Sequence, residues 1–238
     1  MPHITERDLA ATLDHAILKP ELTRTDVDAE LDIAGEWGVF SVCVRPSDVR
    51  HARERLAGTG VAVGTVIGFP HGTTSTAAKV AEVSQALADG AVEFDMVINI
   101  GALRSGFDDV VVGDITAVVA AAGGHMTKVI LETALLDDEQ IARGSRLTEA
   151  GGAHFVKTST GFAGGGATVE HVRLMRENVG AGVQVKASGG VRSYADALAM
   201  LEAGATRLGT SGSAVILGEA RRIDAGEAAT GVVDDTSY

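Results

Sequence analysis

One pattern recurs along the chain and constrains its fold more than any other feature. A helix-like stretch ends in Gly or Ala-Gly, and a short apolar segment follows at once, as in GEWGVFSVCV (35–44), ADGAVEFDMVIN (88–99), EAGGAHFVKTS (149–159) and EAGATRLGTS (202–211). A glycine just past a helix end can take the left-handed C-cap conformation. The β-branched, apolar residues that follow are typical of strands buried on both faces of a parallel sheet. The pattern therefore predicts repeated strand–helix units.

Extending this pattern along the chain gives eight strand candidates. They are 14–18, 39–44, 61–68, 92–98, 127–131, 153–157, 182–187 and 206–209. Helical patterns separate them, for example at 73–90 and 193–204, and further helices are expected to start at Pro46–Ser47 and at Asp137. Alternating strands and helices imply right-handed crossovers and a parallel sheet. Eight such units in 238 residues favour a closed (β/α)₈ TIM barrel over an open doubly wound sheet.

The sequence also predicts the structure at the two ends of the chain and the number of domains. A first helix is expected to end at Asp14 and His15, against the first strand. No linker or composition shift indicates a second domain, so we expect one barrel domain over 1–238. The stretch from about 218 is rich in Gly, Ala and Asp and weakly apolar, which predicts a short helix followed by a polar tail.

Composition excludes several classes of partner. The formal net charge is −12 and aromatic residues make up only 4%, which disfavours nucleic acid and anionic membranes. A phosphate site in so acidic a chain has to be local, built from helix N-termini and a few cations. The single cysteine, Cys43, excludes an intrachain disulfide. Neither a signal peptide nor a membrane span is recognisable, so a cytoplasmic protein is expected.

Lysine is the most informative residue type, because the chain has only five. Lys157 and Lys186 end two predicted strands in matching phrases, HFVKTS and VQVKAS, and Asp95 lies within EFDMVIN. In a barrel, function resides at the carboxyl ends of the strands, and a buried lysine is costly unless it is paired or used. Two neighbouring ammonium groups should lower each other's pKa from about 10.4. A neutral Lys157 amine could then capture an aldehyde, with Asp95 relaying protons, although a purely structural Lys–Asp–Lys cluster remains the alternative.

Glycine-rich turns follow the same strands and suggest an anion site. STGFAGGGAT (159–168) follows the Lys157 strand, SGGV (188–191) follows the Lys186 strand, and GTSGS (209–213) follows the last strand. Such turns expose backbone N–H groups, and many barrels bind phosphate after strands 7 and 8. Ordinary left-handed turns are the alternative explanation for each of them.

The remaining candidates for chemistry are weaker. The seven histidines are scattered and show no metal-ligand spacing, so no metal or other cofactor is expected. Cys43 ends a predicted strand, either as a small core residue or as part of the pocket lining. Asp14 is a candidate for a helix cap or a pocket residue.

Four segments together resemble a known family. FVKTSTGF (155–162), EFDMVINIGAL (93–103), VKASGGVR (185–192) and LDHAIL (13–18) are similar, in order and spacing, to the signature segments of the deoxyribose-phosphate aldolases. The resemblance covers about 9 to 216. It implies a class I aldolase that cleaves 2-deoxy-D-ribose 5-phosphate without a cofactor. Some family members carry Lys after KTSTG, whereas this chain has Phe162.

The resemblance also assigns roles to residues. It implies that Lys157 forms the Schiff base, that Lys186 and Asp95 relay protons, and that a terminal tyrosine, here Tyr238, dips into the site. It also implies that Gly189, Gly190, Gly209 and Ser211 hold the phosphate. The other residues expected to contact substrate are Asp14, Cys43, Thr158 and Gly161. Sugar phosphate and aldehydes are then the small-molecule partners, and a homo-oligomer, dimer or tetramer, is expected.

Two alternatives remain open from the sequence. Another class I sugar-phosphate aldolase or a transaldolase would be favoured by a pocket with room for a substituent on the enamine carbon. A non-catalytic barrel that binds sugar phosphates is disfavoured by the Lys157, Lys186 and Asp95 set, because a binding protein has no need of a buried neutral amine.

Overall fold

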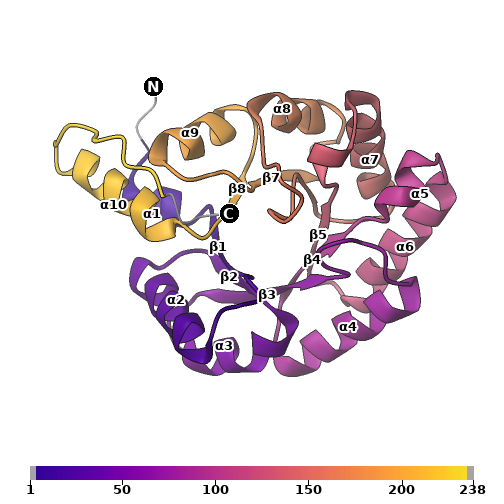
Figure 1. Ribbon diagram of the computed structural model, residues 1–238, viewed down its shortest axis with the longest axis horizontal. Coiled ribbons are helices and arrows are strands. Elements are labelled where there is room, and N and C mark those ends of the chain that lie inside the picture. The colour runs from indigo at the N-terminus through magenta and orange to yellow at the C-terminus, as the bar shows by residue number, and fades with distance from the viewer. Residues whose placement is uncertain (1–3, 235–238) are drawn as a thin grey trace.

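A computed structural model describes residues 4–234, which form a closed barrel of parallel strands in chain order, with β1 beside β8 (Figure 1). The strands are β1 (Leu13–Ile17), β2 (Ser41–Val44), β3 (Ala62–Ile67), β4 (Glu93–Val97), β5 (Met126–Ile130), β6 (Phe155–Lys157), β7 (Gln184–Ser188) and β8 (Arg207–Thr210). Each lies within two residues of its predicted bounds. The predicted (β/α)₈ barrel is therefore confirmed.

Helices surround the barrel and meet its outer face through a continuous apolar layer. They are α1 (Glu6–Ala10), α2 (Arg24–Trp37), α3 (Val49–Arg55), α4 (Thr76–Asp89), α5 (Ile100–Arg104), α6 (Asp108–Ala121), α7 (Asp138–Ala150), α8 (Val169–Glu177), α9 (Tyr194–Glu202) and α10 (Ser213–Asp224), with 3₁₀ turns η1 (Pro46–Asp48) and η2 (Thr133–Leu135). None of the helices between residues 4 and 234 combines the length and apolarity that a bilayer crossing requires.

Local signals in the sequence explain where these helices begin and end. Asp137 caps α7 with a reciprocal capping box to Gln140, as the predicted helix start requires. At the C-terminal ends of α2 and α4, Gly38 and Gly90 have φ of 59° and 101°. This left-handed backbone turns the chain directly into the next strand, which confirms the reading of the recurrent glycines.

The expected end of the first helix was wrong. Helix α1 stops at Ala10, where the Thr12 hydroxyl donates to the carbonyl of Leu9, and Asp14 and His15 lie inside β1. The strand pairs Asp14 with Ser41 of β2 and with Gly209 of β8. Asp14 is buried there because basic side chains within the barrel compensate its charge.

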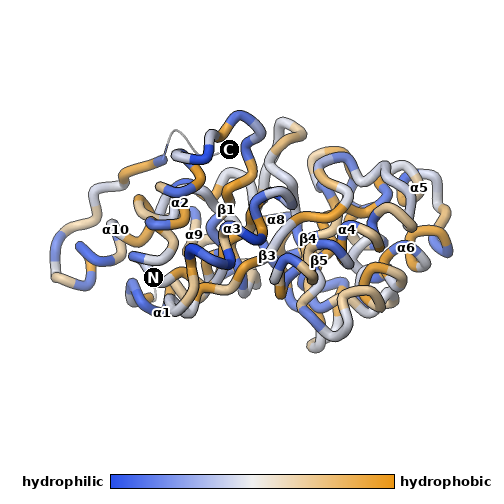
Figure 2. The backbone as a smooth tube through the Cα atoms, turned by 90° about the horizontal axis from the view of Figure 1, so that it is seen from below, coloured by the Kyte–Doolittle hydropathy of each residue, from blue (hydrophilic) through white to orange (hydrophobic). Residues whose placement is uncertain are grey.

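The C-terminal region has the expected order of a helix followed by a tail. Helix α10 starts at Ser213, earlier than expected, and the irregular segment begins after Asp224. Glu219 anchors this segment by accepting hydrogen bonds from the backbone N–H groups of Thr230 and Gly231. The chain after α10 then rises to the face opposite α1 (Figure 2), where the N–H of Asp234 donates to the carbonyl of Arg192 at 2.9 Å. The described part of the tail therefore reaches the rim of the barrel.

Candidate active site

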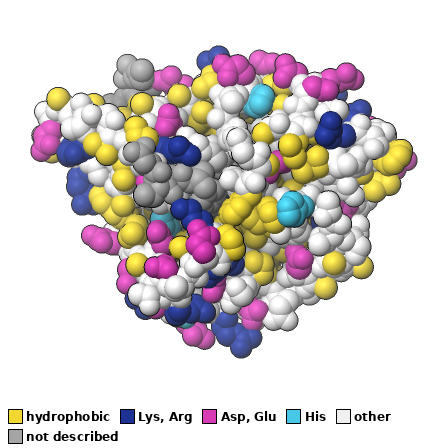
Figure 3. Space-filling view, viewed as in Figure 1, with side chains coloured by type: hydrophobic (Ala, Val, Ile, Leu, Met, Phe, Trp, Pro, Cys, Tyr) yellow, Lys and Arg dark blue, Asp and Glu magenta, His cyan; other side chains and the backbone are white. Residues whose placement is uncertain are grey.

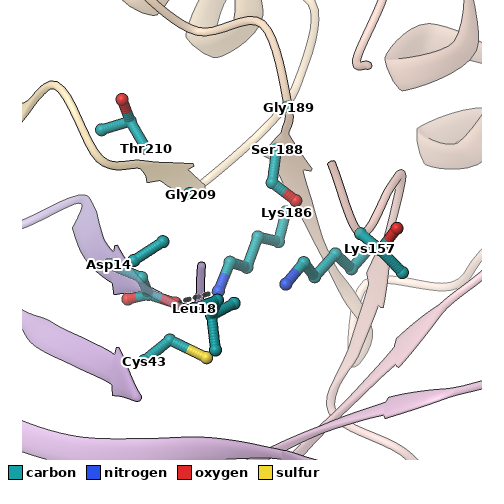
Figure 4. A pocket seen from close by; sticks show the side chains of 11 residues that line it. Asp14, Leu18, Cys43, Lys157, Lys186, Ser188, Gly189, Gly209 and Thr210 are labelled. Atoms are coloured by element: carbon teal, nitrogen blue, oxygen red, sulfur yellow. Dashed lines mark hydrogen bonds and ion pairs between the residues drawn. The ribbon is translucent and has the colours of Figure 1, made fainter. Parts of the chain in front are cut away.

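A cavity lies at the carboxyl ends of the strands on the β6–β8 and β1 side of the barrel (Figure 4). Its walls are Asp14, Ala16, Leu18, Cys43, Lys157, Thr160, Lys186, Ser188, Gly189, Gly209 and Thr210. The side chains of Lys157 and Lys186 extend from neighbouring strands toward the same space, as their pairing in the barrel register requires. Six of the predicted site residues thus line one cavity.

Asp95 lies beneath this cavity, and its carboxylate accepts hydrogen bonds from three lysines. Its Oδ2 accepts hydrogen bonds from Lys157 Nζ at 2.9 Å and from Lys186 Nζ at 2.8 Å. Its Oδ1 accepts one from Lys128 Nζ at 2.8 Å. All four side chains are at least 96% buried, so their charges act on one another with little screening by water. The predicted grouping of Lys157, Lys186 and Asp95 is present in the structure.

Below this grouping the ion network extends further into the barrel. Arg207 donates to Asp14 Oδ1 at 2.7 Å and to Glu93 Oε1 at 3.0 Å. Lys128 donates to Glu93 Oε2 at 2.6 Å, and Lys186 donates to Asp14 Oδ2 at 2.5 Å. The barrel interior therefore contains a closed network of ion pairs instead of an apolar layer at this level.

The network compensates its cations unequally. Lys128, Lys186 and Arg207 each contact at least two of its carboxylates. Lys157, in contrast, contacts one carboxylate among residues 4–234, and it shares that oxygen of Asp95 with Lys186. Because four basic groups face three carboxylates, the release of one proton neutralises the cluster. Lys157 is the group from which that proton leaves at the lowest cost.

The pKa values follow this inequality. Burial lowers the pKa of Lys157, and the positive charge of Lys186 adds to that effect, although Asp95 opposes it. Burial also acts to lower the pKa of Lys186, but Asp14 and Asp95 outweigh it, so the pKa of Lys186 is raised. The expectation that both lysines have lowered pKa values was therefore wrong for Lys186. Its two carboxylate partners dominate the repulsion from Lys157.

Asp95 stays ionised in this setting. Burial would raise its pKa, yet the positive charges of Lys128, Lys157 and Lys186 hold the pKa well below the ordinary value. The cluster therefore places a permanent carboxylate directly beside the one lysine that is easiest to deprotonate. This combination can accept or return a proton next to an amine that can act as a nucleophile.

Neither Cys43 nor Thr158 belongs to the ion network. Cys43 lines the cavity, and burial, with the charge of Asp95, raises the pKa of its thiol to about 11, so the thiol stays protonated. The Thr158 hydroxyl donates to the carbonyl of Ser188 at 3.0 Å and accepts from the N–H of the same residue. It ties β6 to β7. Neither Thr158 nor Gly161 is part of the cavity wall.

The glycine turns after β7 and β8 form one side of the cavity. At Gly209 a Cβ atom would fall 2.7 Å from Ser188 Cβ and 3.1 Å from Lys186 Cε, so only glycine fits. Gly189 lines the cavity, and Gly190 beside it is exposed with φ of 76°. Ser211 follows β8 at the rim, just before α10 begins. The predicted phosphate residues are thus neighbours, on the side of Lys157 that faces β7 and β8.

Two further expectations concern metals and the tail. Among residues 4–234 no three His, Cys, Asp or Glu side chains are arranged to hold a metal ion. Tyr238 lies outside the described residues.

Three members of the ion network were not identified from the sequence: Glu93, Lys128 and Arg207. A signal was present, because each is a charged residue within a strand that was predicted to be buried. Glu93 stands two positions before Asp95, so both side chains face the barrel interior. A search of all predicted strands for inward-facing charges would have found them.

Comparisons with known proteins agree with this geometry. The sequence model described as "DeoC/LacD family aldolase" matches residues 9–219. "Deoxyribose-phosphate aldolase 2" of Staphylococcus aureus (strain MRSA252) is 57% identical over 208 residues, which are 87% of this chain and 94% of that protein.

Solved structures give the same picture. A putative deoxyribose-phosphate aldolase from Coccidioides immitis superposes with a TM-score of 0.89 at 42% identity, covering 93% of this chain and 88% of that one. A deoxyribose phosphate aldolase from Aeropyrum pernix, described as tetrameric, superposes with a TM-score of 0.85 at 31% identity, covering 92% and 93%. With its barrel, its buried lysine pair and these relatives, the chain belongs to the DeoC/LacD family of aldolases.

Proposed function

We propose that this chain catalyses the reversible cleavage of 2-deoxy-D-ribose 5-phosphate to D-glyceraldehyde 3-phosphate and acetaldehyde, with Lys157 as the Schiff-base lysine. The observation that carries the proposal is the unequal compensation within the buried cluster. Lys157 lines the cavity, its ammonium group shares Oδ2 of Asp95 with Lys186, and its pKa is lowered. The similar aldolases from S. aureus and C. immitis support the same reaction.

The steps follow from the placement of these groups. The neutral Lys157 amine attacks the C1 aldehyde of the open-chain sugar, and the carbinolamine loses water to give an iminium ion. The C3 hydroxyl then loses its proton, the bond between C2 and C3 breaks, and its electrons pass to the iminium to form an enamine. Asp95 and Lys186, which hydrogen-bond each other, transfer the protons. Protonation at C2 and hydrolysis release acetaldehyde and restore the amine.

The two alternatives make different demands on the site. A non-catalytic binding barrel would gain nothing from a desolvated amine beside an ionised carboxylate, which costs folding free energy without improving recognition. A transaldolase or ketose-phosphate aldolase would need room for a substituent on the enamine carbon. Turnover of deoxyribose 5-phosphate against ketose phosphates distinguishes these activities directly.

The proposed function is tested by trapping. Sodium borohydride added with acetaldehyde should reduce the imine to an N-ethyl group, and peptide mapping should find that group on Lys157. Cleavage of deoxyribose 5-phosphate should proceed equally in EDTA, because the iminium serves as the electron sink. An adduct confined to other lysines, or an activity that EDTA removes and zinc restores, would contradict the Schiff-base assignment.

For the phosphate, we propose that backbone N–H groups at Gly189, Gly190, Gly209 and Ser211 hold it. Gly190→Leu should raise KM for deoxyribose 5-phosphate by about tenfold relative to free deoxyribose, since no other atom lies within 4 Å of the added Cβ and the side chain would enter the anion site. Gly123→Leu is the matched control. Gly123 also has a left-handed φ and open space, but it lies between α6 and β5, at the other end of the barrel. Equal losses on both substrates in Gly190→Leu would remove the phosphate role.

For the tail, we propose that Tyr238 exchanges a proton with the enamine carbon. The supporting observation is the hydrogen bond from Asp234 to Arg192, which brings the described chain to the barrel rim four residues before Tyr238. Tyr238→Phe should slow turnover and the exchange of acetaldehyde methyl protons with solvent, with little change in KM. Exchange and turnover at the wild-type rate would show that the phenol takes no part.

We also propose that the chain acts in the cytoplasm as a homo-oligomer, as a dimer or tetramer. The A. pernix relative, whose description calls it tetrameric, supports assembly. Light scattering of the purified protein measures the state directly.

A further inference from the structure

A second cavity, of about 250 Å³, lies beside the lysine cavity on the same face of the barrel. Four loops form it: those after β3 (Pro70, His71, Thr73), β4 (Ile100), β5 (Glu132, Leu135) and β6 (Thr160, Phe162, Ala163). Thr160 also lines the lysine cavity, so the two cavities adjoin at this residue. The proposed phosphate turns follow β7 and β8, whereas this cavity opens in the other direction.

The walls of this cavity are mainly apolar. Phe162 and Leu135 remain 39% and 44% exposed although both are large hydrophobic side chains. Phe162 is held edge-on against Phe69, with ring centroids 5.3 Å apart. Figure 3 shows hydrophobic side chains gathered in the middle of this face, in contrast to its charged margin. A concave, mainly apolar surface with few polar groups is typical of a small-molecule site.

The floor of the cavity holds an unusual residue. Glu132 has φ of 61°, the one positive φ of a non-glycine residue among positions 4–234, and it is 1% exposed. Its carboxylate accepts hydrogen bonds from both the N–H and the hydroxyl of Thr160. Burial raises its pKa. Backbone strain and a buried carboxyl in a pocket tend to occur together at functional sites.

Backbone hydrogen bonds also hold the Glu132 segment against the strand that carries the reacting amine. The residues on either side of it, Leu131 and Thr133, donate their N–H groups to the carbonyls of Lys157 and Thr158, at 2.9 and 3.0 Å. The register partner of Lys157 is Ile130, so Glu132 follows two residues later, just past the end of β5. Lys157 and Thr160 line the lysine cavity and Thr160 also lines this one, so the amine and the second cavity adjoin at Thr160.

We propose that this cavity is a second subsite, which takes the hydrocarbon chain of a straight-chain aliphatic aldehyde bound to Lys157 as the aldol donor. The inference rests on the proposed function. If the phosphate turns after β7 and β8 draw C3 to C5 of the sugar to one side, a chain on C2 is left facing the β3–β6 side, where the cavity lies. The apolar walls favour a hydrocarbon chain, because a hydroxylated or charged chain would lose its hydrogen bonds to water there.

The donor reaction balances without a further reactant. The Lys157 amine condenses with the aldehyde and releases one water, and loss of a C2 proton gives the enamine. C2 then forms a bond to the carbonyl carbon of glyceraldehyde 3-phosphate, whose oxygen takes up a proton. One water hydrolyses the resulting iminium, which frees the aldol and the amine.

The experiment compares pentanal with acetaldehyde as donor, with glyceraldehyde 3-phosphate as acceptor. The wild-type protein should form the aldol from both, and borohydride should leave an N-pentyl group on Lys157 with pentanal. Ala163→Phe fills the cavity and should lower the ratio of kcat/KM for pentanal to that for acetaldehyde by about tenfold or more. The same substitution at Val110, 55% exposed on α6, is the matched control and should leave the ratio unchanged.

Leu135→Trp is a second variant that fills the cavity, and it tests the proposed subsite if Ala163→Phe fails to fold. The subsite is overturned if wild-type protein yields no N-pentyl Lys157, or if the ratio in the folded filling variant stays at the wild-type value. Failure of the proposed function gives a different result, because neither acetaldehyde nor pentanal would then modify Lys157 and deoxyribose 5-phosphate would not be cleaved.

Discussion

Lys157→Ala and Lys157→Arg should both be folded and should both lose cleavage of deoxyribose 5-phosphate, by on the order of 10⁴-fold or more. Alanine removes the nucleophile. Arginine keeps a positive charge near Asp95 but stays protonated at any working pH, so it cannot add to an aldehyde. The fold should survive, because Asp95 retains hydrogen bonds from Lys128 and Lys186 when Lys157 is absent. No carboxylate is left buried without a partner.

Three measurements check this prediction. Circular dichroism and the thermal midpoint test the fold, the cleavage rate tests the chemistry, and borohydride with acetaldehyde tests the covalent step. Both variants should lack the N-ethyl adduct that the wild-type protein carries. A folded Lys157→Ala variant with a tenth of wild-type turnover would transfer the Schiff base to another residue, for which Lys186 is the nearest cavity lysine.

The barrel could be predicted from the sequence because its signals are local. Each strand after the first is a short apolar run that follows a helix with glycine at or near its end, and these runs needed only to be counted in order. Lys157 and Lys186 could be paired for the same reason. They end consecutive predicted strands, and consecutive strands of a barrel are neighbours, so their register partners follow from the chain order.

The charge balance could not be predicted, because it depends on contacts across the barrel. Lys186 was expected to lose affinity for its proton, yet Asp14, 172 positions away, lies 2.5 Å from its ammonium group. Asp14 itself was assigned both to the end of a first helix and to the start of the strand at 14–18, and neither assignment gave it a partner inside the barrel. Without Asp14 in the barrel the direction of the Lys186 pKa shift cannot be derived.

The second cavity could not be predicted from the sequence, for a different reason. It is assembled from four loops, and its floor depends on a left-handed backbone at Glu132, which no local rule predicts for a glutamate. The hydrogen bonds to Thr160 that hold this conformation join residues 28 positions apart. A pattern of residue types can indicate a loop at this point in the chain, but it does not predict the backbone φ angle of a glutamate within it.

Asp95→Asn should reduce both stability and catalysis. The amide keeps the shape of the carboxyl group but removes the negative charge that three lysines share, and it turns an N–H donor toward one of them. Four basic groups then face only Asp14 and Glu93. Leaving buried charges uncompensated in this way typically costs about 3–5 kcal/mol in the free energy of unfolding.

The pH dependence of this loss has a definite sign. The folded pKa of Asp95 lies well below its unfolded value of about 3.9. A carboxyl group of this kind stabilises the folded state at pH values above the unfolded pKa, and that contribution disappears as the pH falls toward the folded pKa. The difference in unfolding free energy between wild type and Asp95→Asn should therefore be full near neutral pH and shrink below about pH 4. A difference that grew on acidification would contradict the depressed pKa.

Catalysis separates the chemical role of Asp95 from its structural role. Asp114 on α6 is also buried and lies 2.5 Å from a lysine, Lys79, outside the lysine cavity. Asp114→Asn is therefore a matched control that should also reduce stability but leave kcat close to wild type. Asp95→Asn should lower kcat by about 10²–10⁴-fold at a temperature where both variants are folded. Lys157 should still react with acetaldehyde and borohydride, because loss of the Asp95 charge lowers its pKa further. Slow turnover with an intact adduct would place Asp95 in proton transfer, whereas equal kcat values in the two variants would limit it to holding the barrel together.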